Sequence, residues 1–229
     1  MSEDVPRRLS RFRQKSGGGA DLPSGDDAPL HQAAAEGRTR RIEALLAAGS
    51  DPSAVDDCGR MPLHYAAAYG QTEAVEMLLQ AGSDPNALAY PGHTPLHYAS
   101  GNGQCKAVET LLAAGSNPNA TGPHGGTPLH HAALHGQYTV VQALVAAGAD
   151  PNARAIRRGT PLHYAIQQGS IKMVEALLSG GSDPNALTQD GRSALDIAAD
   201  SSHAEAVKVL LTAGGELHGA APPSPAEIN

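Results

Sequence analysis

The sequence predicts an all-α solenoid, in which similar helix-helix-hairpin units stack along one axis. The main observation is that the phrase Thr94-Pro95-Leu96-His97 returns in related form every 33 residues, so that six copies stand in strict register. Glycines and an Asx-Pro-Asn phrase return at the same interval. A fixed period of this length indicates stacked supersecondary units, each of which needs its neighbours to bury its apolar face.

The repeated phrase predicts the start of a short helix. Thr94 suits the N-cap, because its hydroxyl can accept a hydrogen bond from a helical amide, and Pro95 suits the first helical position. Gly103 can take the left-handed conformation that ends a helix, so this helix has about two turns. The other five copies are Ala28-Pro29-Leu30-His31, Met61-Pro62-Leu63-His64, Thr127-Pro128-Leu129-His130, Thr160-Pro161-Leu162-His163 and Ser193-Ala194-Leu195-Asp196.

A second helix and an extended connection complete each unit. Val108, Leu111 and Leu112 recur at helical spacing and predict an apolar face, and Gly115 ends the run. The connection Asn117-Pro118-Asn119 follows, where proline excludes helix and the flanking side chains favour Asx turns.

These motifs resemble those of the ankyrin repeat family, from about residue 25 to about residue 218. The resemblance implies L-shaped units stacked into a curved solenoid, whose hairpin tips and inner helices line a concave groove that usually binds another protein. It also implies that the motif histidines hold each helix to a neighbouring loop.

Composition and charge narrow the function classes. Only 3% of residues are aromatic, which suits small interfaces filled by Ala, Leu and Val, and two cysteines predict no disulfide framework. No apolar run suggests a signal peptide or a membrane span, so we expect a cytoplasmic or nuclear protein. The net charge is −7, with +2 on residues 1–23 and therefore −9 on the rest. An acidic solenoid disfavours nucleic acid and favours a partner protein with a basic surface.

Both ends of the array are predicted to differ from its interior. Residues 1–24 lack apolar periodicity and are interpreted as a disordered basic tail. Within it, Arg7-Arg8-Leu9-Ser10 resembles a site for basic-directed serine kinases and the arginine run a nuclear address, against the alternative of a merely solvated tail. Residues 25–218 form the six repeats, the first and last of them caps, and residues 219–229 a disordered proline-rich tail.

Repeat five carries two irregularities. Ile166 stands where the neighbouring repeats have alanine or serine, so we expect the packing to open slightly there. Arg158 stands where four other hairpins have glycine, which predicts an altered tip.

Histidines suggest one alternative function. The periodic histidines are assigned to the framework, which leaves a local group of His93, His124, His131 and His135. His131 and His135 share a helix face, so the group could bind metal, although no carboxylate or cysteine is placed to complete such a site. We expect a contact surface that titrates and no metal or cofactor.

The residue after the motif histidine forms a ladder along the inner helices: Tyr65, Tyr98, His131 and Tyr164. Tyrosine is a frequent interface anchor, so these side chains could contact a partner, or they could pack between repeats. The family's variable positions add further predicted contacts on hairpin tips and at the ends of the first helices. They are Asp57, Cys58, Arg60, Ala68, Tyr69, Tyr90, His93, Asn102, His124, Leu134, His135, Ile156, Arg157 and Gln168.

The sequence therefore predicts a monomeric, non-enzymatic protein that binds another protein as an adaptor or stoichiometric inhibitor. A metal-dependent protein and a bacterial effector directed at a host protein stay as alternatives. The family resemblance also implies asparaginyl hydroxylation at Asn86, Asn119, Asn152 and Asn185, each of which lies eight residues after a leucine.

Overall fold

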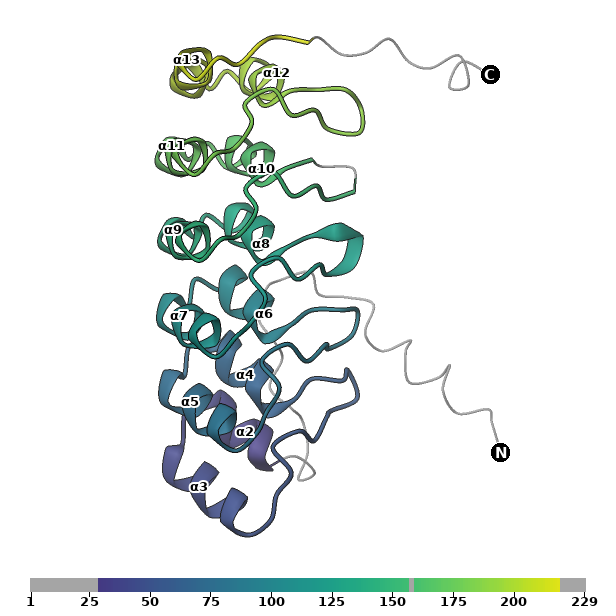
Figure 1. The fold of residues 1–229 in the computed structure, drawn as a ribbon, viewed down its shortest axis with the longest axis vertical. Coiled ribbons are helices and arrows are strands. Elements are labelled where there is room, and N and C mark those ends of the chain that lie inside the picture. The colour runs from purple at the N-terminus through teal and green to yellow at the C-terminus, as the bar shows by residue number, and fades with distance from the viewer. Residues whose placement is uncertain (1–28, 157–158, 219–229) are drawn as a thin grey trace, which may run out of the picture.

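A computed structural model describes residues 29–156 and 159–218. The two predicted tails, with Ser10, and the repeat-five residues Arg157 and Arg158 lie outside the described residues. Within that part of the chain, helices in two columns and a short 3-10 turn, η2 (Pro123–Gly125), make an elongated stack (Figure 1). The prediction of an all-α solenoid is confirmed.

Each repeat contributes one seven-residue helix to an inner column, next to the hairpins, and one nine-residue helix to an outer column. The inner helices are α2 (Pro29–Ala35), α4 (Pro62–Ala68), α6 (Pro95–Gly101), α8 (Pro128–Leu134), α10 (Pro161–Gln167) and α12 (Ala194–Asp200). The outer helices are α3 (Thr39–Ala47), α5 (Thr72–Gln80), α7 (Cys105–Ala113), α9 (Tyr138–Ala146), α11 (Ile171–Ser179) and α13 (Ala204–Thr212).

The inner helices begin as their capping residues predict. Thr94 Oγ1 accepts a hydrogen bond from the His97 amide at 3.4 Å, and the Thr94 amide donates to Nδ1 of His97 at 3.1 Å. Gly103 has a φ of 73°, and the equivalent glycines in the other interior repeats are also left-handed. Ser202 takes this place in repeat six and keeps a φ of 57°.

The core is a continuous series of small interfaces between adjacent repeats. Leu96 and Leu111 are fully buried, as are the leucines at the same two offsets in repeats two, four and five. Ile166 is fully buried as well, in the place where the neighbouring repeats have smaller side chains. Burial of these aliphatic side chains provides the main stabilisation of the stack.

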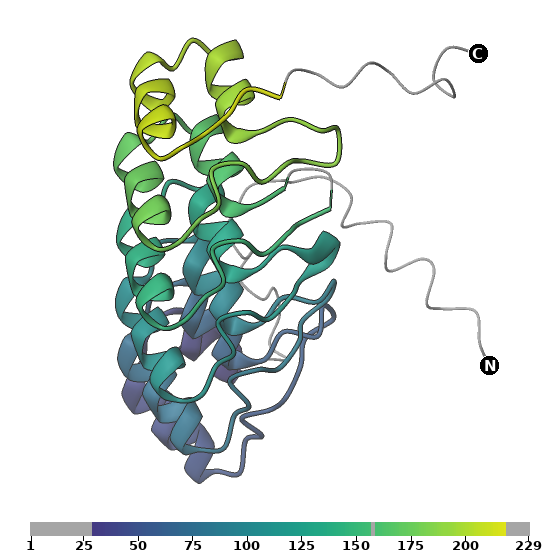
Figure 2. The ribbon, with the colours of Figure 1, turned by 45° about the horizontal axis from the view of Figure 1, so that its top comes forward.

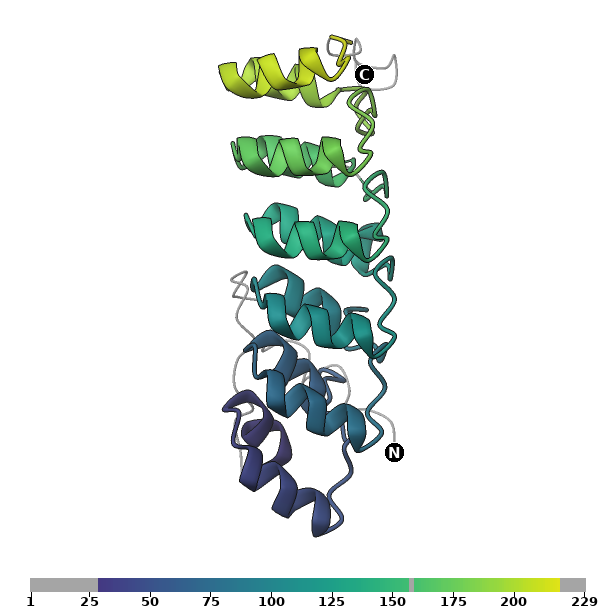
Figure 3. The same ribbon diagram turned by 60° about the vertical axis from the view of Figure 1, so that its left-hand side comes forward.

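The hairpins project from one side of the stack (Figures 2 and 3). Among the described residues, main-chain hydrogen bonds join neighbouring tips at two places. The Tyr90 amide donates to the carbonyl of Cys58 at 2.8 Å, and the Ile156 amide donates to that of His124 at 2.7 Å. No helix of the described residues is long and apolar enough to cross a membrane.

Candidate protein-interaction surface

Side chains alternate between inside and outside along each hairpin. Ala89 is 1% exposed and its amide bonds to the carbonyl of His93, whereas Leu88 and Tyr90 on either side are 64% and 73% exposed. Successive side chains of an extended chain point to opposite faces, so Leu88 and Tyr90 lie on the same face of the hairpin. We call the outward residues at these two offsets the hairpin face: Val55, Asp57, Leu88, Tyr90, Thr121, Pro123, Arg154, Ile156, Leu187 and Gln189.

Sequence reasoning missed Val55 and Leu88. Val55 is 61% exposed, and the two residues are 33 positions apart, at an offset where later repeats have Thr121 and Arg154. The signal that could have found them is the two-residue alternation with Asp57 and Tyr90, which were predicted. Large exposed aliphatic side chains beside an exposed tyrosine are typical of an interaction surface.

The predicted contacts at the inner helices fall into two groups. Tyr69, Asn102, His135 and Gln168 directly follow their helices as C-cap residues, and all four are at least partly exposed. Ala68, in contrast, is 4% exposed, so we correct its assignment as a contact residue.

Leu134 and Ile156 differ in what they offer to a partner. Leu134 is half-buried and packs against the core, whereas Ile156 is 61% exposed. Only Ile156 can therefore present most of its apolar surface.

The tyrosine ladder mainly packs between repeats. Tyr65 is fully buried, and its ring meets His31 of the preceding repeat edge-on at 5.8 Å between centroids. Tyr164 is 9% exposed and meets His130 in the same way. The prediction that Tyr65 and Tyr164 contact a partner is therefore corrected, because their rings fill inter-repeat space. Tyr98 is half-buried and packs on His64.

Arg60 is held inside the hairpin of repeat two. Its Nε lies 2.8 Å from Oδ2 of Asp56, which also accepts from the Tyr65 hydroxyl at 2.6 Å. Its guanidinium lies 4.7 Å from the centroid of the Tyr65 ring. Desolvation alone would raise the pKa of Asp56, but the hydrogen bonds from Tyr65 and Arg60 outweigh it and lower that pKa. The Arg60 charge is thus neutralised internally, whereas Asp57 is exposed and Cys58 half-buried at the tip.

Three imidazoles meet at the junction of repeats three and four. The ring centroids of His93, His97 and His131 lie 5.0 to 5.4 Å apart, all in edge-on contact. The framework residue His97, which sequence reasoning had set aside, therefore completes the group. His124 is exposed on the η2 tip, and His135 is exposed after α8.

Two sets of observations bear on the metal-binding and titrating roles that the sequence suggested for the histidine cluster. Nδ1 of His97 accepts from the Thr94 amide, and Nε2 lies 3.2 Å from the carbonyl of Gly126, so both nitrogens are occupied. No group of three or more His, Cys, Asp or Glu that could hold a metal is found in residues 29–156 and 159–218. Burial lowers the pKa of His93, and burial with neighbouring histidines lowers that of His131 to about 3. The prediction that His131 titrates near neutral pH is therefore corrected, whereas titration of His93 stays a prediction.

The four loop asparagines join adjacent repeats. The Asn86 side chain donates to the carbonyl of Gly115 at 3.0 Å and accepts from the Asn117 amide at 2.8 Å. Asn119, Asn152 and Asn185 make the same pair of bonds one repeat further on. These contacts give each asparagine a structural role, and hydroxylation stays a prediction.

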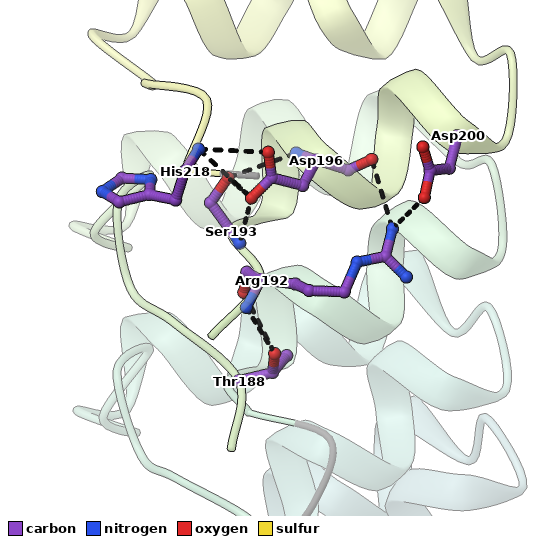
Figure 4. A network of polar contacts seen from close by, with 6 residues as sticks. All are labelled: Thr188, Arg192, Ser193, Asp196, Asp200 and His218. Atoms are coloured by element: carbon purple, nitrogen blue, oxygen red, sulfur yellow. Dashed lines mark hydrogen bonds and ion pairs between the residues drawn. The ribbon is translucent and has the colours of Figure 1, made fainter. Parts of the chain in front are cut away.

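Repeat six ends in a polar network (Figure 4). Asp196 is 7% exposed and replaces the motif histidine. Its carboxylate accepts from the amide and hydroxyl of Ser193 at 2.8 and 2.9 Å, and from the His218 amide at 3.1 Å. Arg192 pairs with Asp200 at the edge of the network. The bond from the His218 amide thereby ties the last segment to the array.

Comparisons with known proteins agree with this architecture. A family profile described as ankyrin repeats (3 copies) matches residues 30–122 and 129–219, and one described as ankyrin repeats (many copies) matches residues 106–145. Among solved structures, an ankyrin repeat domain from Acinetobacter baumannii AYE is 33% identical, with a TM-score of 0.76. The alignment covers 83% of this chain and all of that one. A search of curated protein sequences gave no match.

Proposed function

Since the chain belongs to the ankyrin repeat family, whose repeats are generally protein-protein interaction modules, we propose that it is an adaptor or stoichiometric inhibitor that binds one partner protein. The partner contacts the hairpin face and the exposed ends of the inner helices. The observation that carries this proposal is the exposed apolar group of Val55, Leu88 and Tyr90 on hairpins that main-chain hydrogen bonds hold together.

The chemistry of this surface supports protein as the ligand. Tyr90 offers a large apolar area with one hydroxyl and few rotatable bonds, which is the profile of an interface anchor. Tyr69 and His135 are exposed at the ends of α4 and α8 and offer a hydroxyl and an imidazole to a partner. An apolar centre with a polar rim distinguishes an interface from ordinary surface.

The charge of the array supports a basic partner surface. Residues 29–218 carry seventeen carboxylate side chains and eleven Lys or Arg side chains, which gives −6. Such a field speeds encounter with a cationic surface and repels an anionic one, and its effect weakens with salt.

The test begins with affinity purification and mass spectrometry to identify the partner. Tyr69, Tyr90 and His135 are then replaced by alanine one at a time, with Leu211→Ala as a matched control that is also exposed but lies in repeat six. At least one of the three should lose about 2 kcal/mol or more of binding free energy, as interface anchors do. The melting temperature should stay unchanged. If all three variants bind as the wild type does, the partner contacts neither the hairpin face nor the exposed ends of the inner helices.

A further inference from the structure

The hairpins of repeats two and three are acidic, whereas that of repeat five is basic. Residues 51–60 and 84–93 together contain Asp51, Asp56, Asp57 and Asp84 against Arg60 alone, a net charge of −3. The equivalent residues 150–159 contain three arginines and one aspartate, a net charge of +2. The net charge of the hairpin sequences thus changes sign from repeats two and three to repeat five.

Exposed apolar side chains gather at the acidic end. Four of the seven large apolar residues that are exposed in the described chain lie between positions 55 and 90: Val55, Tyr69, Leu88 and Tyr90. Because the Tyr90 amide bonds to the Cys58 carbonyl, the hairpins of repeats two and three present Val55, Leu88 and Tyr90 together. This end therefore fits a segment with apolar anchors between cations.

The chain itself contains such a segment. Residues 7–15, Arg-Arg-Leu-Ser-Arg-Phe-Arg-Gln-Lys, carry five positive charges and no negative one. Leu9 and Phe12 stand between these cations, and Phe12 is the one phenylalanine of the sequence. The proposed binding of a partner by the repeats assigns no role to residues 7–15.

The segment is close enough to reach the acidic hairpins. Phe12 lies seventeen positions before Pro29, where α2 begins. A connection of that length spans up to about 55–60 Å when extended. The hairpin of repeat three lies two repeats further along the stack, about 20 Å at the usual spacing of packed helices.

We propose that residues 7–15 dock on the hairpin face of repeats two and three, with Leu9 and Phe12 against Leu88 and Tyr90, and so compete with the partner. The docking is a property of the isolated chain. The competition rests on the proposed function.

Other exposed apolar positions fit this segment less well. Ile156 is on the hairpin that carries a positive net charge, with Arg154 two residues away, and would repel the cations. Leu211 and Leu217 lie in repeat six, at the opposite end of the stack from Pro29. Charge, apolar content and reach all favour repeats two and three.

Two cysteines allow the docking to be measured, because one lies at the proposed docking site and the other lies elsewhere. Cys58 is half-buried at the tip of repeat two, and Cys105 is half-buried on the outer helix α7. A small neutral thiol reagent is applied to the full chain, and mass spectrometry measures the modification rate of each cysteine. If the segment covers the hairpins about two-thirds of the time, the Cys58 rate is about threefold lower than in the uncovered state.

The first comparison uses the full chain with Leu9→Ala and Phe12→Ala. We expect Cys58 to react about threefold faster in this variant, and Cys105 to react at the wild-type rate. Withdrawal of nearby cations raises the pKa of a thiol and slows its reaction, so an increase reports uncovering. High salt screens the attraction between the segment and the acidic hairpins, so it should increase the Cys58 modification rate in the wild type.

The second comparison changes the hairpin side. Leu88→Ala should increase the modification rate of Cys58. The matched variant Ile156→Ala, which changes a side chain of similar exposure, should leave that rate unchanged. In the Leu9→Ala, Phe12→Ala background, Leu88→Ala should cause no further increase in the Cys58 rate, because the effects of residues that share one contact are not additive. Equal Cys58 rates in the wild type and in the Leu9→Ala, Phe12→Ala variant, at low salt, would overturn the proposal.

These outcomes separate docking from partner binding. Failure of the cysteine test leaves the proposed function standing, since partner affinity is measured independently. Conversely, Cys58 protection with an unaltered partner affinity in the Leu9→Ala, Phe12→Ala variant supports docking and refutes competition. Ser10→Glu, which places a carboxylate among the cations, should also increase the Cys58 rate.

Discussion

At the fourth position of the repeated phrase, repeat three has a hydrogen-bond donor to the neighbouring segment, whereas repeat six has an acceptor. In repeat three, Nδ1 of His97 accepts from an amide, so Nε2 carries the proton and donates to the carbonyl of Gly126 in the next hairpin. In repeat six, Asp196 replaces the histidine and accepts from the amide of His218. The histidine of repeat three donates to a carbonyl of the next repeat. The aspartate of repeat six accepts from an amide of the trailing chain, by which we mean the residues that follow α13.

The trailing chain otherwise imitates a further repeat. The Glu216 amide donates to Oδ1 of Asn185 at 2.8 Å, as the Asp183 amide donates to Asn152 one repeat earlier. The comparison teaches that repeat six keeps the asparagine contacts of the interior and changes the group at position 196, whose partner is different.

The largest difference between the two regions should come from leucine removal. Leu111 is fully buried between repeats, and Leu111→Ala should lower the free energy of unfolding by about 2–5 kcal/mol. Leu211 on α13 stands at the offset of the half-buried Leu112 and is 56% exposed, so its replacement by alanine should change the free energy of unfolding by no more than about 0.5 kcal/mol. Urea unfolding measures both. Overlapping curves for wild type and Leu111→Ala would contradict the buried face assigned here.

Exchange of the two polar groups tests the comparison directly. Asp196→His removes the acceptor of the Ser193 and His218 groups, and should cost about 1–3 kcal/mol, as unsatisfied buried polar groups do. His97→Asp places a carboxylate opposite the carbonyl of Gly126 and should cost at least as much. Urea unfolding with unchanged circular dichroism is the measurement. A neutral result for either exchange would show that the position tolerates donor and acceptor alike.

Acid should weaken the interior through its buried histidines. Burial lowers the pKa of His97 to about 4 and, with neighbouring histidines, that of His131 to about 3. Between about pH 6.5 and these values the unfolded chain binds more protons than the folded chain, so stability falls as pH falls. His131→Tyr introduces the residue found at that offset in repeats two, three and five. Its loss of unfolding free energy between pH 7 and pH 5 should be about 1–2 kcal/mol smaller than that of the wild type.

The control for this measurement is His135→Tyr, because His135 is exposed beside the same junction. Because His135 is one of the charges that act on His131, that variant should change the pH dependence less than His131→Tyr does. The groups acting on His131 are His93, His97, His130 and His135, all histidines, so no carboxylate among them offsets the effect. An unchanged pH dependence in His131→Tyr would count against buried neutral imidazole at this junction.

The smallest expected effect concerns helix ends. Ser202 has a φ of 57°, where interior repeats place glycine, and a side chain in this conformation costs about 1 kcal/mol. Ser202→Gly should therefore stabilise the protein by about that amount. Gly169→Ser should destabilise it similarly, because a Cβ there would meet His203 at an ordinary 3.4 Å and the cost is conformational. Thermal unfolding of both variants checks the opposite signs.

The candidate surface was only partly predictable from the sequence. Tyr90 and Ile156 follow from offset alone, because every hairpin has the same shape. Tyr65 does not, since its burial depends on His31 and Asp56 from two other segments. Val55 and Leu88 required the alternation around Ala89 to become visible.

The sequence by itself determined the repeat, its two helices, their caps and their buried leucines, because these depend on residues within one 33-residue unit. Tertiary structure decided what lies across the junctions. It buried Tyr65, brought His97 together with His93 and His131, and paired Asp196 with the His218 amide. The physical reason is that periodicity fixes local geometry, whereas burial and hydrogen-bond pairing at a junction depend on the side chains of both neighbours.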